Sequence, residues 1–170
     1  MKNNFFNIIF FIAALALYRL IPHPPNFTPI LATAVMCPLL FKDRLYGIAI
    51  PVFAMFISDI IIGFHPYQFV IYATILSIGF FTPMKKNLLL IGTSACIASL
   101  WFFFTSNFAV WIIWDYYPKT FEGFINCYTL ALPFFKNTII STLFFSGTLF
   151  FLSNLLSKIN KRINFLIFNK

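Results

Sequence analysis

Residues 88–107 read LLLIGTSACIASLWFFFTSN and contain neither a charged side chain nor a proline. The segment is apolar on every helical face. Crossing the hydrocarbon core of a bilayer takes about 17–25 apolar helical residues. Inside lipid the backbone polar groups must be satisfied internally, and a helix satisfies them within one segment. This stretch therefore predicts a transmembrane helix, and it indicates the class of the whole chain.

The composition of the 170-residue chain agrees with a membrane environment. Hydrophobic residues make up 61% of it, and Phe alone occurs 26 times. Charged residues make up only 9%, whereas a soluble domain carries about a quarter. Water would solvate such a chain poorly, so the lipid bilayer is its expected partner. The three cysteines form no Cys-x-x-Cys pair, which argues against a zinc ribbon or a disulfide framework.

The hydrophobic pattern predicts an all-α membrane protein, a bundle of about six transmembrane helices in one domain over residues 1–170. Prolines mark several of the boundaries, as at Pro22 and Pro83. A semi-polar outer connection, with room for a short surface or re-entrant helix, is expected over residues 114–133, and a basic cytoplasmic tail over 157–170. The expected spans are residues 5–21, 27–41, 45–63, 68–82, 88–107 and 134–156.

The basic residues predict how these spans are oriented. With a cytoplasmic amino terminus, nine of the twelve Lys and Arg residues fall in the inner segments. This asymmetry follows the positive-inside rule and predicts a multi-pass protein of the bacterial inner membrane with both termini in the cytoplasm. This predicted topology requires the short second span to cross the membrane fully, since Lys42 and Arg44 would otherwise lie on the outer side. The net charge of +8 therefore needs no nucleic acid as a partner.

The remaining polar residues gather on the outer side. Both histidines and three of the four acidic residues lie there, which suggests a polar cavity that opens outward. The candidate ligand-binding residues are Arg19, His23, Asn26, Asp59, His65, Asn107, Trp111, Tyr117, Lys136 and Asn137.

Asp59 is the sharpest single signal, because residues 56–62 read FISDIII. A carboxylate is costly in lipid, so it usually faces the bundle interior or a wet cavity. It could accept a hydrogen bond from a ligand or carry a proton, or it could form an ion pair with Arg19 or Lys136. Arg19 likewise could extend to the membrane interface, anchor an anionic ligand group, or pair with Asp59.

The two histidines lie in proline-containing turns. Residues 22–26 read PHPPN, so His23 is held on a stiff loop, which suits a site, although a solvated loop histidine is the alternative. His65 precedes Pro66 in a similar turn. Together with Asp59 they have no recognised metal-ligand spacing, so no metal is expected.

Aromatic residues near the outer boundary have two interpretations. Trp111 and Tyr117 could belong to an interfacial aromatic belt, or they could stack on a flat ligand. The basic and acidic residues of the outer side nearly cancel, so a neutral, zwitterionic or mixed-charge ligand fits better than a polyanion.

Common catalytic motifs are missing from the sequence. It has no Gly-x-Ser-x-Gly elbow, no His-Glu-x-x-His and no phosphate-binding Gly loop. No cofactor is expected, and an enzyme is the less favoured interpretation. Energised transport would need a partner or an ion gradient.

The stretch RLIPHPPNFTP, residues 19–29, resembles the opening signature of a family of small bacterial membrane proteins without an assigned function. Residues 58–65 resemble its second signature, and ALPFFKNT, residues 131–138, part of its third. The resemblance covers most of the chain. The family is distantly similar to the S components of energy-coupling-factor vitamin importers, six-helix proteins with an outward-facing ligand site. This implies an S-component-like bundle and an energising transporter module as a partner. The first span departs from that pattern, because it has no pair of small residues four apart.

The sequence thus leads us to expect a membrane-embedded binding protein for a small polar or vitamin-like solute, which serves uptake. Two alternatives stay open. One is an intramembrane enzyme that uses Asp59 and His23 as acid and base. The other is a ligand-free assembly or structural protein.

Overall fold

The computed structural model describes the backbone of residues 2–168 and the side chains of residues 6–45, 47–159 and 162. These residues form helices and no strand, so the prediction of an all-α protein with six helices is confirmed. The helices are α1 (Lys2–Leu20), α2 (Ile30–Phe41), α3 (Arg44–Ile62), α4 (Gln68–Phe81), α5 (Leu88–Ile113) and α6 (Phe121–Phe168).

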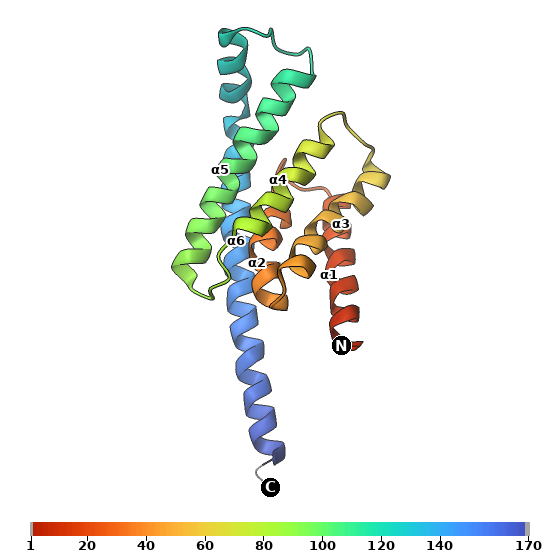
Figure 1. The fold of residues 1–170 in the computed structure, drawn as a ribbon, viewed down its shortest axis with the longest axis vertical. Helices are drawn as coiled ribbons and strands as arrows, with labels where there is room; N and C mark the ends of the chain where they lie inside the picture. The colour runs from red at the N-terminus through yellow and green to blue at the C-terminus, as the bar shows by residue number, and fades with distance from the viewer. Residues whose placement is uncertain (1, 169–170) are drawn as a thin grey trace.

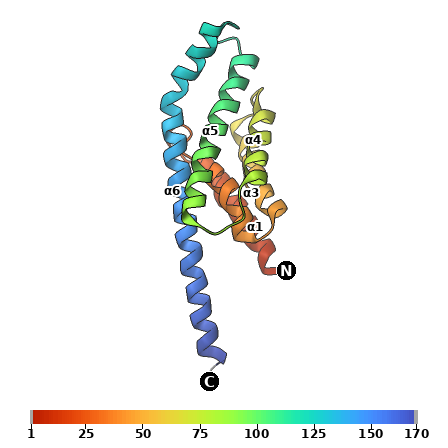
Figure 2. The same ribbon diagram turned by 60° about the vertical axis from the view of Figure 1, so that its left-hand side comes forward.

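Consecutive helices run up and down, so the connections alternate between the two ends of the bundle (Figure 1). Both ends of the chain lie at the lower end. The connections α1–α2, α3–α4 and α5–α6 lie at the upper end (Figures 1 and 2). The assignment of the two ends as inner and outer stays a prediction.

Helix α2 lies at the centre of the bundle. It contacts α3, α4, α5 and α6, and its residues from Ile30 to Pro38 are all buried. A helix that is apolar all round is stable only when it is enclosed. The core around it includes Val35, Ile50 and Ile75, each at most 1% exposed. The centre of the bundle is therefore protein packed on protein.

Helices α2 and α3 approach each other closely at Gly47. A Cβ atom built there would lie 2.3 Å from the backbone nitrogen of Pro38, so only a residue without a side chain fits. Pro38 has no backbone N–H and can adjoin another backbone without leaving a donor unpaired. The pair explains why a proline inside α2 is compatible with the fold.

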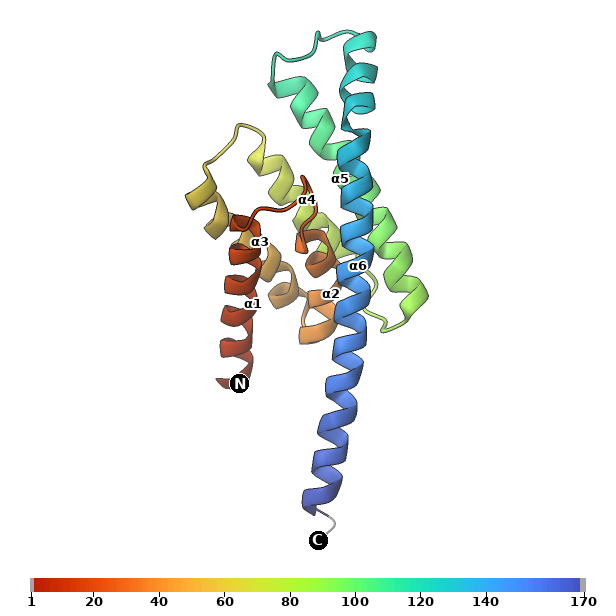
Figure 3. The same cartoon turned by 180° about the vertical axis from the view of Figure 1, so that it is seen from behind.

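Helix α6 begins earlier than the sequence suggested. Residues 121–133, placed in the outer connection, form its first turns and run without a break through Pro133. Their semi-polar composition did not indicate the contacts with α5 that favour a helix here. The Tyr128 hydroxyl donates to the Phe104 carbonyl over 2.8 Å, and the rings of Trp111 and Phe124 meet edge to face with centroids 5.3 Å apart. Figure 3 shows α6 lying along α5 and continuing past the bundle. The predicted basic tail continues α6 to Phe168, and two of its four basic side chains, those of Lys161 and Lys170, lie outside the described residues.

Two helices are long and apolar enough to cross a membrane, namely residues Leu88–Ile113 and Phe121–Ile159. The stretches Phe6–Leu20, Ile30–Phe41, Gly47–Ile62 and Gln68–Phe81 are apolar but shorter.

Candidate ligand-binding cavity

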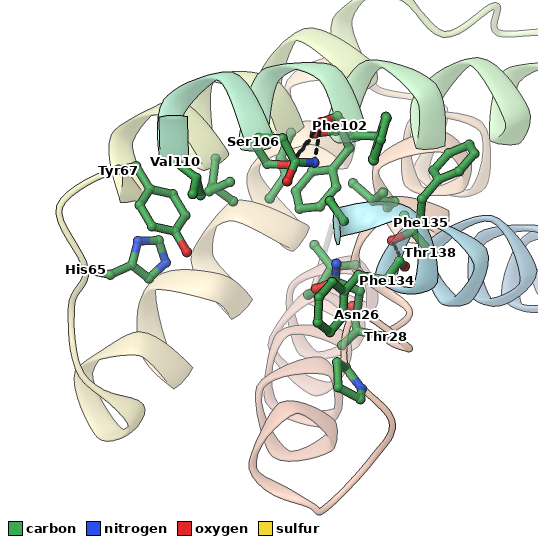
Figure 4. Close-up of a pocket in the computed structure, with 18 of the residues that line it drawn as sticks. Asn26, Thr28, His65, Tyr67, Phe102, Ser106, Val110, Phe134, Phe135 and Thr138 are labelled. Carbon is green, nitrogen blue, oxygen red and sulfur yellow. Dashed lines mark hydrogen bonds between the residues drawn. The ribbon is translucent and has the colours of Figure 1, made fainter. Parts of the chain in front are cut away.

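A cavity of about 570 Å³ lies at the upper end of the bundle. All six helices and the three upper connections contribute to its lining. Figure 4 shows His65 and Tyr67 side by side at one edge, with Asn26 and Thr28 at another. Ligand pockets commonly measure about 300–1,000 Å³ and are mostly apolar with a few polar groups. The cavity has the size and the composition of such a pocket.

An ion pair holds Arg19 at the edge of the cavity. Its Nη1 atom donates to Oδ1 of Asp59 over 2.6 Å, to the hydroxyl of Ser58 over 2.5 Å, and to the Met55 carbonyl over 3.2 Å. The Asp59 side chain is 2% exposed and that of Arg19 is 16% exposed. Of the two interpretations of Asp59, the structure shows the ion pair with Arg19.

The second oxygen of Asp59 is also bound. Oδ2 accepts from the amide nitrogen of Gln68 over 3.0 Å and from the Tyr72 hydroxyl over 2.8 Å. Gln68 and Tyr72 stand one turn apart on α4 and also contact each other. A buried carboxylate is tolerated when a counter-charge and hydrogen bonds satisfy both oxygens. The network therefore joins α1, α3 and α4 beside the cavity.

The proline-rich loop after α1 is attached to α6. Asn137 donates its amide nitrogen to the Pro25 carbonyl over 3.0 Å, and the Ser141 hydroxyl donates to the Asn26 carbonyl over 3.3 Å. Asn26 adopts a left-handed backbone with φ of 61°, which asparagine tolerates better than most residues. His23 Nδ1 lies 2.6 Å from the Ile21 carbonyl oxygen. This loop is thus held in place as part of the cavity wall.

Aromatic rings form the wall around His65. The rings of His65 and Tyr67 are 4.2 Å apart, and Tyr67 meets Trp114 edge to face at 5.2 Å. The Nδ1 atom of His65 is buried and has no hydrogen-bond partner among the described residues. A buried polar atom without a partner is uncommon and calls for a ligand or a water. His65 therefore lines the cavity with an imidazole whose buried Nδ1 atom has no partner among the described residues.

Burial shifts two titrating groups of this wall. Desolvation lowers the pKa of His65 below its ordinary value; Asp59 partly opposes this shift, whereas Arg19 adds to it. Desolvation also raises the pKa of Tyr67, with a smaller contribution from Tyr116. Both shifts favour the neutral forms of these side chains at neutral pH.

The opposite wall comes from α5 and α6. Phe103 and Phe135 lie with ring centroids 4.7 Å apart. Ser106 and Asn107 donate to carbonyls of their own helix, over 2.6 Å to Phe102 and 2.7 Å to Phe103. Figure 4 shows Phe102, Ser106 and Val110 on α5 beside Phe134, Phe135 and Thr138 on α6. The lining here is mostly aromatic with a few small polar groups.

The structure brings six of the ten candidate residues together in the cavity lining. They are Arg19, His23, Asn26, His65, Asn107 and Tyr117. The other four are not among the lining residues, namely Asp59, Trp111, Lys136 and Asn137.

Each of the four has another place in the fold. Asp59 pairs with Arg19 behind the wall, and Asn137 holds the proline-rich loop. Trp111 donates its indole N–H to the Pro118 carbonyl over 3.1 Å. Lys136 is exposed. Their expected contact with a ligand stays a prediction.

Sequence reasoning missed most of the aromatic lining, and it missed Gln68 and Tyr72 as hydrogen-bonding partners of Asp59. The aromatic residues carried no signal, because Phe is so frequent in this chain. Gln68 and Tyr72 did carry one, because two polar residues one turn apart on a largely apolar helix indicate a buried polar partner.

Among the described residues, no group of three or more His, Cys, Asp or Glu side chains is placed to hold a metal ion. Fold and cavity together define an all-helical bundle with an aromatic-lined, polar-edged pocket at one end. The chain belongs to the Family of unknown function (DUF6580), whose profile matches residues 1–164. This confirms its membership of a family without an assigned function. No curated protein and no solved structure matches the chain, so the likeness to S components stays a prediction.

Proposed function

We propose that this protein binds a small polar or vitamin-like solute within the bacterial inner membrane, as the substrate-binding component of an importer. The observation that carries the proposal is the 570 Å³ cavity with six candidate residues in its lining. In a bundle oriented by the positive-inside rule, this cavity faces outward.

The exterior of the bundle supports a multi-pass arrangement. Large apolar side chains point away from the core on several helices, with Phe69 83% exposed, Phe81 78% and Leu89 76%. Water-soluble monomers rarely expose apolar patches that extend over several elements. The connection before α5, with Lys85 and Lys86, and the junction of α2 and α3, with Lys42 and Arg44, lie at the end that holds both termini (Figure 1). These features support six spans with both termini in the cytoplasm.

Helix α2 is the short span in this arrangement. Its 12 residues cover about 18 Å at the rise of an α-helix, less than the roughly 30 Å of a bilayer core. Non-helical backbone is tolerated at membrane depth where protein surrounds it. The loop that continues α2 upward is bonded to Asn137 and Ser141 of α6, which satisfy the carbonyl groups of Pro25 and Asn26.

The arrangement of Asp59 supports binding over acid–base catalysis. Both carboxylate oxygens are bonded to protein groups, and the residue is 1% exposed. A general base must reach the proton that it abstracts. His65 lines the cavity and Asp59 does not, so His65 is better placed for contact with a solute.

Native mass spectrometry of gently extracted protein tests the proposal. Asn107→Leu replaces a lining amide by an apolar group of similar size, and Asn154→Leu makes the same change lower on α6, outside the cavity lining. Wild type and Asn154→Leu are expected to carry the same small molecule, and Asn107→Leu to lose most of it. Three ligand-free spectra from folded protein, or a co-purifying protein in place of a small molecule, would contradict the proposal.

A further inference from the structure

The charge of the cavity depends on a residue that does not line it. Among the described lining residues, Arg19 alone carries a permanent charge. Other polar side chains of the lining, such as those of Asn26, Ser106 and Thr138, carry no charge. A lone cation beside an apolar cavity would select anions, because charge interactions strengthen where water is excluded.

Asp59 cancels that charge from behind the wall. It lies 2.6 Å from Nη1 of Arg19, and its second oxygen accepts from Gln68 and Tyr72. Two hydrogen bonds and an ion pair hold the carboxylate in one position. The cavity lining therefore holds one positive permanent charge, that of Arg19, and the Asp59 carboxylate behind it holds one negative charge.

Arg19 still has donors left for a solute. Its hydrogen bonds to Met55, Ser58 and Asp59 all use Nη1, which leaves Nε and Nη2. A guanidinium presents these two donors in a fixed plane, and they can meet a single oxygen or a pair of oxygens.

Resting on the proposed solute binding, we propose that Asp59 sets the charge selectivity of the cavity without touching the solute. It keeps the cavity neutral, so that Arg19 binds an uncharged planar solute through a carbonyl-type oxygen. An anionic solute would bring a second negative charge beside buried Asp59, and a cationic one a second positive charge beside Arg19. Both leave an uncompensated charge in an apolar site, which is costly.

Three planar probes of equal size test this inference: benzamide, benzoate and benzamidine. Their binding is measured by ligand-detected NMR on the full chain in lipid nanodiscs, with protein-free nanodiscs as the blank. Wild type is expected to prefer neutral benzamide over both ions by at least about tenfold, because an uncompensated charge costs more than one hydrogen bond gains. A wild type that prefers either ion overturns the inference without any substitution.

The variant Asp59→Asn removes the compensating charge and keeps the shape. It is expected to reverse the order, so that benzoate binds more tightly than benzamide. The matched control is Tyr72→Phe, which removes a hydrogen bond to Asp59 but no charge; it is expected to keep benzamide first. A merely structural role for Asp59 would weaken all probes alike in both variants.

The outcomes separate this inference from the proposed function. Probes that bind in an order unaffected by Asp59→Asn overturn the role of Asp59 and leave solute binding intact. Failure of wild type to bind any probe at about 10 mM overturns the inference, and solute binding itself is then decided by the native mass spectra of wild type, Asn107→Leu and Asn154→Leu. Folding of each variant is checked by its size-exclusion profile and circular dichroism.

Discussion

Single residues at the cavity edge owe their positions to charge compensation. Arg19 extends from α1 into a region surrounded by apolar side chains, and the nearly buried carboxylate of Asp59 meets it at 2.6 Å. Removing one member of a buried pair leaves the other charge unpaired, which costs more than the pair itself contributes.

Arg19→Met is therefore expected to destabilise the fold by about 3–5 kcal/mol. The double variant Arg19→Met, Asp59→Leu removes both charges and is expected to recover most of that loss. Denaturation of both variants in detergent micelles measures the difference. A single variant as stable as wild type would show that the pair is not desolvated.

His65 predicts a pH dependence of stability. In the folded state, burial lowers the pKa of His65 from its ordinary value of 6.5. The nearby Asp59 carboxylate partly opposes this shift, and Arg19 adds to it. The unfolded chain then takes up a proton at a higher pH than the folded one, so stability is complete above pH 6.5 and falls as the pH drops below it. Stability measured between pH 7.5 and 5 should fall less in His65→Gln, and equal slopes would contradict the burial of this ring.

At the scale of single residues, the sequence indicated Asp59 and Arg19 but not the aromatic lining of the cavity. A carboxylate among isoleucines indicates a buried polar network whatever its partner, and Arg19 was one of two partners considered. Which partner Asp59 meets depends on how α1 packs on α3, which no local pattern encodes. The aromatic lining could not be separated from the many other Phe residues.

Among the elements, α2 and α3 approach each other closely where Gly47 meets Pro38. Gly47 leaves no space for a methyl group beside the Pro38 backbone. A Cβ atom added at Gly92, on α5, would instead have nothing within 4 Å. Substitution by alanine is therefore expected to have opposite effects on stability at these two glycines.

Gly47→Ala is expected to cost about 1–3 kcal/mol through overpacking. Gly92→Ala is expected to gain up to about 1 kcal/mol, because alanine loses less entropy in a helix. Thermal melting of the two variants beside wild type checks both signs. Similar melting temperatures for the two variants would refute the close approach.

Helix positions followed from hydrophobicity, whereas helix ends did not. The apolar run of α5 is recognisable without any tertiary contact. The start of α6 at Phe121 depends on pairing with α5, as in the bond from Tyr128 to Phe104. Tertiary packing of this kind routinely overrides local composition.

At the scale of the whole molecule, the proposed orientation places the cavity outside and both termini inside. A cysteine-free background in which Cys37, Cys96 and Cys127 are replaced by alanine allows single reporters to be placed. Asp115→Cys lies at the cavity end, and Met84→Cys in the connection before α5 at the other end (Figure 1).

A membrane-impermeant maleimide is expected to label Asp115→Cys in intact spheroplasts and Met84→Cys only after lysis. The positive-inside distribution of Lys and Arg is the reason for this order. The reverse pattern would turn the cavity towards the cytoplasm, and labelling of both sites in intact spheroplasts would contradict a membrane crossing by α5 between them.

The most direct test of the account is a crystal structure of protein extracted with its native lipids and grown in a lipid mesophase. We predict non-protein density within the 570 Å³ cavity, in hydrogen-bonding contact with Arg19 and beside the imidazole ring of His65. A cavity closed by its own aromatic side chains, with His65 bonded to a protein group, would contradict solute binding.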